Sequence, residues 1–209
     1  MNAALLRELD PDRTTLFPWT VELYHRLIDQ GILPEGEPYE LLDGVLVRKD
    51  RSSRGEDPMT VGRPHAYAVH ALARLATGLE GTGTFLMTQS PIVAGSTHEP
   101  EPDAAVVLGS NNAYRDHHPQ AADVLCAIQV ADSSLRRDRG VKQRIYAEAG
   151  IPQYVIVNLA DRVIEQYTVP LASGGEYRHR VIAKPGEVLT IGLGHGRGQW
   201  NVPVAEVLP

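Results

Sequence analysis

Two carboxylates and one amide side chain stand where apolar segments of the sequence begin or are interrupted. In EPEPDAAVV, Glu101 and Asp103 are two residues apart, so they share one face of an extended chain, and Pro102 stiffens its entry. In LCAIQVADSS, Gln129 interrupts an apolar run, and a buried polar group costs about 1–3 kcal/mol if it is left unpaired. We therefore expect Asp103 to be the main carboxylate of a site and Gln129 to have a polar partner.

A second group of polar side chains follows on a helix predicted over residues 136–149. Asp138 and Lys142 are four residues apart, and Tyr146 continues the same face, so a carboxylate, an amine and a phenol point the same way. This helix comes directly after the run that contains Gln129, so side chains from separate segments can converge. The sequence thus indicates a candidate site where a buried strand meets the following helix.

Each of these residues also has a structural explanation when it is taken alone. Asp103 after a proline can end a loop, and Gln129 can cross-link two strands. Asp138 and Lys142 can form an exposed helical pair, which contributes only about 0.3–0.5 kcal/mol. Both interpretations therefore stay open on these residues alone.

The elements that must position the site begin with an arm, a helix and a hairpin. Residues 1–18 show no period and are expected to form a loosely attached arm, and residues 19–209 a single domain. Thr20 can cap a helix that Gly31 ends. The Asp-Gly pair at 43–44, between YELL and VLVR, predicts a tight hairpin turn.

The middle of the chain alternates between helices and strands. Residues 50–64 have no period and are a candidate substrate flap, and a second helix is predicted from about His65 to Leu79. The helix over 136–149 ends at Gly150. Strands are predicted at 84–89, 91–95, 103–108, 123–131, 153–159, 162–170, 177–183 and 187–193.

The apolar content of these strands predicts their places in the sheet. The runs at 103–108 and 123–131 are almost continuously apolar, as in central strands covered on both faces, whereas 162–170 and 177–183 are expected at the edge. The pattern predicts an α/β (α+β) fold, a mixed β-sheet flanked by helices.

The composition is that of a globular protein. The chain has 209 residues, of which 43% are hydrophobic and 22% charged, and no apolar run approaches the ~18 residues that span a bilayer. The first residues carry acidic groups where a signal peptide needs an apolar block. Cys126 is the single cysteine, and it lies in an apolar run, so we expect it to fill core space in a reducing cytoplasm, with no membrane partner.

The net charge of −6 argues against a histone-like protein that binds nucleic acid through its overall field. A nucleic-acid function would need local basic patches. Two occur, one at Arg48, Lys49, Arg51 and Arg54 and one at Arg136, Arg137, Arg139, Lys142 and Arg144. Charge runs are usually solvated faces, so each patch alone is weak evidence.

Two further patterns indicate no site. The Gly-rich segment 192–200 fails the dinucleotide-binding pattern, because Arg197 replaces the third glycine and no helix follows, so it is expected to be a flexible loop. The eight histidines show no ligand spacing and are expected to be solvated or capping residues.

The order of these segments resembles the Uma-type restriction endonuclease family of the PD-(D/E)XK nuclease superfamily. The similarity rests on YELLDG, on His65 at the head of the second helix, on EPEPDAAVV and on VADSSLRRDRGVKQRIYAEAGIPQYVIVNL. It covers about residues 20–170, and 123–159 is its most specific part. The resemblance implies a restriction-endonuclease-like core, an αβββαβ unit, with a divalent-metal site for phosphodiester hydrolysis.

The resemblance also implies roles for single residues. Asp103 matches the acidic metal ligand, Glu40 in YELLDG matches an acid that helps the metal or its water, and Lys142 matches a lysine moved from the sheet to the following helix. The implied catalytic residues are Asp103, Gln129, Lys142 and Glu40, and the implied ligands of Mg²⁺ or Mn²⁺ are Asp103, Gln129 and Glu101. The expected nucleic-acid contacts are His65, Arg136, Arg137, Arg139 and Arg144.

The sequence departs from the family at Gln129, where a glutamate is usual. A glutamine carbonyl can coordinate Mg²⁺, which prefers oxygen ligands, but it brings no charge. A site with Asp103 as its single close anion should therefore hold metal more weakly, unless Glu40 or Glu101 compensates.

Taken together and in this order, the residues predict a Mg²⁺- or Mn²⁺-dependent endonuclease-like protein that hydrolyses DNA. Two cuts on antiparallel strands suit two symmetric subunits, so we expect a homodimer. One alternative is a catalytically inactive module that binds nucleic acid or protein, and Gln129 is the feature that separates it from the nuclease. Another alternative is a hydrolase of some smaller phosphodiester.

Overall fold

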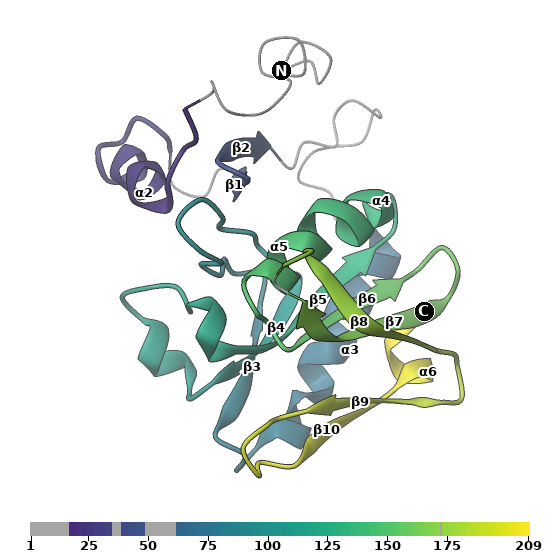
Figure 1. Cartoon of the computed structure of the whole chain (residues 1–209). Helices are drawn as coiled ribbons and strands as arrows, with labels where there is room; N and C mark the ends of the chain where they lie inside the picture. Colours follow the sequence, from purple (N-terminus) through teal and green to yellow (C-terminus); the bar gives the residue numbers. More distant parts are fainter. Residues whose placement is uncertain (1–16, 35–38, 49–61, 172) are drawn as a thin grey trace.

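A six-stranded mixed sheet forms the centre of the computed structural model, which describes residues 17–34, 39–48, 62–171 and 173–209 (Figure 1). In sheet order the strands are β3 (Thr84–Thr88), β4 (Ala104–Leu108), β5 (Val124–Ala131), β6 (Gln153–Asn158), β7 (Val163–Leu171) and β8 (Glu176–Ala183). β5 and β6 run parallel, and the other neighbouring pairs are antiparallel. The predicted fold class, a mixed sheet flanked by helices, is therefore confirmed.

Two hairpins and several helices complete the described part of the fold. The hairpins are β1 (Tyr39–Leu42) with β2 (Val45–Arg48), and β9 (Val188–Gly192) with β10 (Gln199–Pro203). The longer helices are α2 (Val21–Asp29), α3 (Arg63–Leu75) and α5 (Gln143–Glu148). The shorter helical segments are η2 (Ala76–Leu79), η3 (Asn111–Tyr114), η4 (Ala121–Asp123), α4 (Leu135–Arg137), η5 (Asp138–Lys142) and α6 (Val204–Val207).

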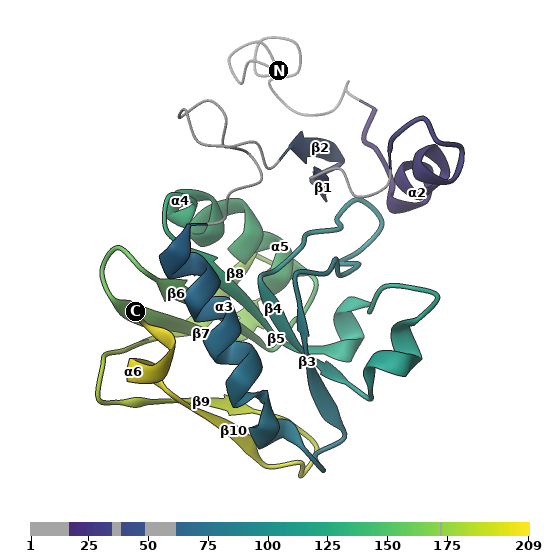
Figure 2. The same ribbon diagram turned by 180° about the vertical axis from the view of Figure 1, so that it is seen from behind.

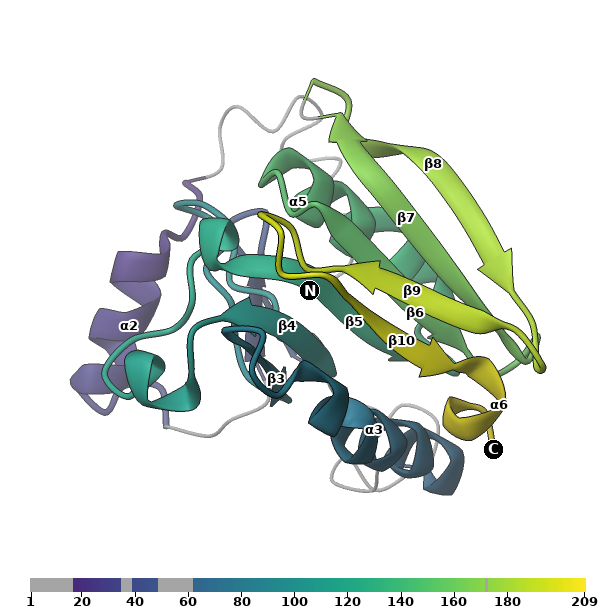
Figure 3. The same cartoon turned by 90° about the horizontal axis from the view of Figure 1, so that it is seen from below.

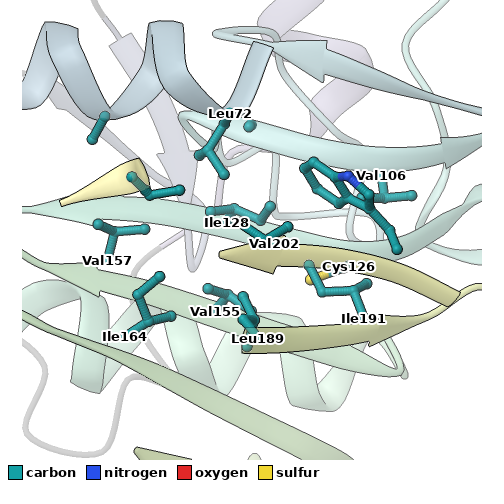
Figure 4. Packing of buried hydrophobic residues seen from close by; sticks show 14 of the residues in the cluster. Leu72, Val106, Cys126, Ile128, Val155, Val157, Ile164, Leu189, Ile191 and Val202 are labelled. Atoms are coloured by element: carbon teal, nitrogen blue, oxygen red, sulfur yellow. The ribbon is translucent and has the colours of Figure 1, made fainter. Parts of the chain in front are cut away.

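The sheet is covered on both faces. Helix α3 crosses one face, and the β9–β10 hairpin lies over the same face (Figures 2 and 3). Leu72 of α3, Ile128 of β5 and Val202 of β10 meet in the cluster drawn in Figure 4. Cys126 is fully buried in this cluster, so its predicted core-filling role is confirmed. Helix α5 covers the opposite face, where Tyr146 packs against Tyr154 with ring centroids 5.0 Å apart.

The alternation of strand β5 decides which way Gln129 points. Ile128 and Val130 face the cluster under α3, whereas Ala127 and Ala131 face the cluster under α5. Successive side chains of a strand point to opposite faces, so Gln129 lies on the α5 side of the sheet. β4 and β5 are both interior strands, as their apolar sequences predicted.

The first helix and the first hairpin form as predicted. The Thr20 side chain accepts a hydrogen bond from the backbone N–H of Leu23 (3.1 Å) and caps α2, and Gly31 follows the helix with a positive φ of 67°. Asp43 and Gly44 both have positive φ, as the tight hairpin turn requires.

Three sequence-based expectations on the sheet and its loops are wrong. Residues 91–95 do not form a strand, because Pro91 lacks an N–H and Gly95 has a φ of 112°; only Val93 makes a bridge, to Gln120. β7 pairs with β6 as well as with β8, so it is interior. The segment 192–200 is not a loop throughout: its end enters β10, where Trp200 is buried and its indole N–H donates to the Leu75 carbonyl (3.0 Å).

The helix predicted over 136–149 is confirmed, with one irregularity. It starts with α4, passes through the π-helical segment η5, and continues as α5. π-Helical turns often occur at functional sites, because they change the direction of side chains within a helix.

Two sequence-based predictions lie mostly outside the described residues. The predicted arm over 1–18 is described only at its last two residues, and the predicted flap over 50–64 only from residue 62, where it leads into α3. Within the described ranges, no helix has the length and apolar character needed to cross a membrane.

Candidate active site

Asp103 lies directly before β4 and is surrounded by hydrogen-bond donors. Its Oδ2 accepts from the backbone N–H of Val130 on the neighbouring strand (2.7 Å), and its Oδ1 lies 2.9 Å from Nε2 of His65. The Asp103 side chain is 19% exposed, whereas that of His65 is 7% exposed. The carboxylate is thus held in place and still reachable from solvent.

The environment keeps the Asp103 carboxyl group ionised. Burial alone would raise its pKa, but the hydrogen bond and charge of His65, the Val130 N–H and the charge of Lys142 together lower the pKa below its ordinary value. A carboxylate that stays negative is the form that can bind a cation or a polarised water.

His65 reaches Asp103 because it lies in the first turn of α3. Proline at position 64 suits the start of the helix, where no intrahelical partner for its nitrogen is needed. The second ring nitrogen of His65, Nδ1, is buried and has no hydrogen-bond partner among the described residues. His65 was expected at a nucleic-acid contact, and in the structure its direct contact is with Asp103.

Gln129 connects Asp103 with the helix after β5. Its amide nitrogen donates to Oδ2 of Asp103 (3.1 Å), and its carbonyl accepts from Nζ of Lys142 (3.1 Å) and from the hydroxyl of Tyr146 (3.2 Å). These partners distinguish the oxygen of the amide from its nitrogen. Gln129 is only 4% exposed, and a buried amide needs hydrogen-bond partners. The expected polar partner is present, because Asp103, Lys142 and Tyr146 each form a hydrogen bond with the Gln129 side chain.

Lys142 is buried and paired with Glu40 of β1. Its Nζ lies 2.7 Å from Oε1 of Glu40, and the side chains are 6% and 1% exposed. The same ammonium donates to the backbone carbonyl of Glu101 (3.3 Å), and Glu40 Oε1 accepts from the Glu101 N–H (2.8 Å). Glu40 therefore positions Lys142, and the backbone of Glu101 holds both.

Asp138 is a buried carboxyl group beside this site. The sequence placed it on the same helix face as Lys142 and Tyr146, but it was not among the expected site residues. It is 1% exposed, and its Oδ2 accepts a hydrogen bond from the Ser134 hydroxyl (2.5 Å). Burial raises its pKa, while the charge of Lys142 and the Ser134 hydrogen bond oppose this shift. The signal for it in the sequence was the four-residue spacing to Lys142.

The structure separates Glu101 from the other candidate ligands. Its backbone belongs to the Glu40–Lys142 arrangement, but its side chain lines a pocket together with His25 and Glu99. The expectation that Glu101 and Asp103 share one strand face is wrong, since regular β4 pairing begins only at Ala104.

The four candidate arginines have different surroundings. Arg139 forms ion pairs with Glu165 and Asp161, and Arg144 forms ion pairs with Asp43 and Glu148. Arg136 and Arg137 are exposed, line a pocket with Ser133 and Ser134, and have no ion pair among the described residues. The structure thus leaves Arg136 and Arg137 as the arginines available to a partner.

Comparison with known proteins gives this site its context. The family model of Uma2, described as "Putative restriction endonuclease", matches residues 21–205. The chain belongs to the Uma2 family. The family predicted from the sequence is therefore confirmed, and the Uma2 match extends beyond the 20–170 segment on which that resemblance was based.

A solved structure shows the same fold. This Uma2 chain is similar to a crystal structure described as a putative nuclease belonging to DUF820 from Anabaena variabilis, with a TM-score of 0.57 and 14% identity. The similarity covers 82% of this chain and 88% of the other. The comparison with curated proteins gives no match. Family and fold together support a nuclease of the restriction-endonuclease-like kind.

Proposed function

We propose that this Uma2 protein is an endonuclease that hydrolyses DNA phosphodiester bonds with the help of Mg²⁺ or Mn²⁺. The observation that carries the proposal is the convergence of Asp103 and Lys142 on Gln129, whose amide lies 3.1 Å from each of them, at the meeting point of β4, β5 and the following helix. These are an acidic residue, an amide and a buried amine from separate segments, in the order that the family implies.

The donor atoms fit a hard divalent cation. Asp103 is ionised and partly exposed. The Gln129 amide presents its nitrogen to Oδ2 of Asp103 at 3.1 Å, so it would have to turn its oxygen toward the ion to become a ligand. Mg²⁺ is commonly held by one or two carboxylates together with substrate phosphates and water, so one carboxylate suffices when DNA is present. The charge of Glu40 is already compensated by Lys142. We therefore expect Asp103 and Gln129 to hold the ion weakly without DNA and more tightly with it.

Once bound, such an ion polarises the scissile phosphate and acidifies a water molecule. The residues of the chain supply the remaining parts. Lys142 offers a preorganised positive charge that stabilises negative charge developing at the phosphate. Glu40 keeps the Lys142 ammonium in place, and His65 orients the Asp103 carboxylate.

We further propose that Arg136 and Arg137 contact DNA phosphates and that the protein acts as a homodimer. Phosphate contacts by arginine give affinity without base specificity. A symmetric dimer would present two active sites to antiparallel strands. The single buried cysteine, Cys126, is consistent with action in a reducing cytoplasm.

The alternative function is a catalytically inactive module that binds nucleic acid or protein. One observation favours it: Gln129 satisfies its own hydrogen bonds by cross-linking Asp103, Lys142 and Tyr146. Such a cross-link stabilises the fold without any metal. The two functions differ in whether Asp103 is needed for a reaction.

A cleavage assay tests the proposal. Supercoiled plasmid and single-stranded DNA are incubated with wild type, Asp103→Asn and the control Arg178→Gln, which changes an exposed residue of β8. Wild type and the control should nick DNA with Mg²⁺ or Mn²⁺ and stop when the metal is chelated, whereas Asp103→Asn should be inactive although folded. Cleavage by Asp103→Asn at the wild-type rate would exclude Asp103 from the site. No cleavage by any of them, with DNA binding retained, would favour the inactive module.

A further inference from the structure

A second group of ligand-type side chains lies outside the candidate active site. His25 of α2, Glu99 and His118 each offer one ligand atom, and these atoms all lie within 4.8 Å of one another. Nε2 of His25 is 2.7 Å from Oε2 of Glu99, and the rings of His25 and His118 meet edge to face at 5.8 Å. Sequence spacing indicated no such group, because its members come from three distant segments.

The backbone fixes the buried member of the group. Glu99 forms two backbone hydrogen bonds with Leu41 of β1. The Glu99 N–H donates to the Leu41 carbonyl (2.7 Å), and the Leu41 N–H donates to the Glu99 carbonyl (3.3 Å). The Glu99 side chain is 3% exposed. The two imidazoles are partly exposed, so the group can be reached from solvent.

The surroundings favour a cation at this place. The three side chains line a pocket of about 1030 Å³ that also contains the carboxylates of Asp29 and Asp116, and Arg115 is the basic residue in its lining. A negative field lowers the cost of bringing a divalent ion into the pocket.

The donor types select the class of ion. Two imidazole nitrogens and one carboxylate suit Zn²⁺ and related transition-metal ions, whereas Mg²⁺ prefers oxygen ligands alone. Three protein ligands would leave one coordination position of a tetrahedral ion open to water.

We propose that His25, Glu99 and His118 bind a transition-metal ion of the Zn²⁺ class, and that this ion fixes helix α2 to the core of the protein. Asp103, four residues after Glu99, faces His65 and Val130 instead. The proposed zinc site and the candidate nuclease site are therefore distinct, and they prefer different metals.

Zn²⁺ titration of the full chain, produced without a histidine tag and freed of metal by a chelator, tests the proposal. The titration is run calorimetrically in excess Mg²⁺, for wild type, His25→Ala, His118→Ala and two controls. The first control is His117→Ala, which removes the neighbouring imidazole, and the second is Asp103→Asn, which changes the candidate nuclease site.

Wild type and both controls should bind one Zn²⁺ per chain. His25→Ala and His118→Ala should each bind Zn²⁺ at least about tenfold more weakly. Removing a residue that only supports a ligand already lowers metal affinity by about tenfold or more, and removing the ligand itself should lower it at least as much. Absence of Zn²⁺ binding to folded wild type would overturn the proposal, and so would wild-type affinity in both His25→Ala and His118→Ala. Loss of binding in Asp103→Asn alone would move the ion to the other site.

Amide hydrogen exchange tests the effect on α2. Zn²⁺ should slow amide exchange within Val21–Asp29 of wild type, because an ion that binds the folded state stabilises the elements it connects. In His118→Ala, Zn²⁺ should leave the exchange rates of the same helix unchanged. Equal exchange in α2 with and without bound Zn²⁺ would show that the ion does not fix the helix.

Discussion

The ammonium of Lys142 lies 2.7 Å from a carboxylate oxygen of Glu40, and both side chains are almost completely buried. The pair joins the first hairpin to the π-helical segment η5 and places the amine beside Gln129. Removing one partner of a buried pair costs about 3–5 kcal/mol, whereas replacing both is often nearly neutral. The pair therefore acts as a unit.

This relationship gives the first prediction. Lys142→Met should destabilise the protein by about 3 kcal/mol, and Glu40→Gln added to it should recover part of that loss, because no isolated buried charge is left. Urea unfolding of the two single variants and the double variant measures the coupling. Strictly additive losses would show that the two residues do not interact energetically.

The second prediction concerns Gln129→Glu. The new carboxylate would keep Lys142 as a partner but would face Asp103 across the 3.1 Å that an N–H now bridges. Two carboxylates at this distance repel each other, so the metal-free variant should melt below wild type. A divalent cation relieves the repulsion, so Mn²⁺ should bind more than about tenfold more tightly and raise the melting temperature more than in wild type. Lower stability with unchanged Mn²⁺ affinity would make Gln129 a structural cross-link.

The third prediction is a loss of stability in acid that originates at Glu165 of β7. Its side chain is fully buried, and burial would raise its pKa, but hydrogen bonds from Arg139, Tyr167 and Asn158 lower the pKa from 4.5 to about 2. Because the pKa of Glu165 is lower in the folded state, the ionised carboxylate contributes to the free energy of unfolding. This contribution is complete above about pH 4.5 and is lost as the pH falls toward 2.

The size of this effect is about 2 kcal/mol, after allowance for the solvent exposure of the arginines around Glu165. Unfolding free energies of wild type and Glu165→Gln, measured between pH 5 and 3, test it, with the exposed Glu176→Gln as control. The wild-type curve should fall more steeply than that of Glu165→Gln. Parallel curves would contradict the assignment.

The fourth prediction concerns the exposed arginines before η5. Neutralising Arg136 and Arg137 to glutamine should weaken DNA binding equally for all sequences and reduce the slope of log affinity against log salt by about 2, because two phosphate contacts are lost. Gel-shift titrations at several salt concentrations give both values, and Arg178→Gln serves as a control. An unchanged slope would show that the two arginines form a solvated surface only.

The sequence was most informative where local rules act. The Asp-Gly pair at 43–44 predicted the hairpin, and the apolar run around Cys126 predicted an interior strand. The polar residue within that run, Gln129, pointed to a partner because burial leaves few choices for an amide. Each of these features depends on residues that are close in the sequence, so it can be predicted without knowledge of the tertiary structure.

Features that depend on distant segments were not predictable in the same way. Glu101 was expected beside Asp103, but the pairing of Glu99 with Leu41 and the late start of β4 direct the two side chains to different places. Strand β10 was missed because it follows a Gly-rich turn and buries only alternate residues. The group of His25, Glu99 and His118 left no spacing signal, since tertiary structure alone brings its members together.

Cleavage of supercoiled DNA by Gln129→Glu tests the central claim most directly, namely that Asp103, Gln129 and Lys142 form a metal-dependent nuclease site. Wild type, Gln129→Glu and Gln129→Glu combined with Asp103→Asn are compared over a range of Mg²⁺ and Mn²⁺ concentrations. Gln129→Glu should cut at lower metal concentrations than wild type, because the added carboxylate increases the affinity for the ion, and the double variant should be inactive. Failure of both wild type and Gln129→Glu to cut DNA at any metal concentration, while both are folded, would contradict the account, as would cleavage by the double variant.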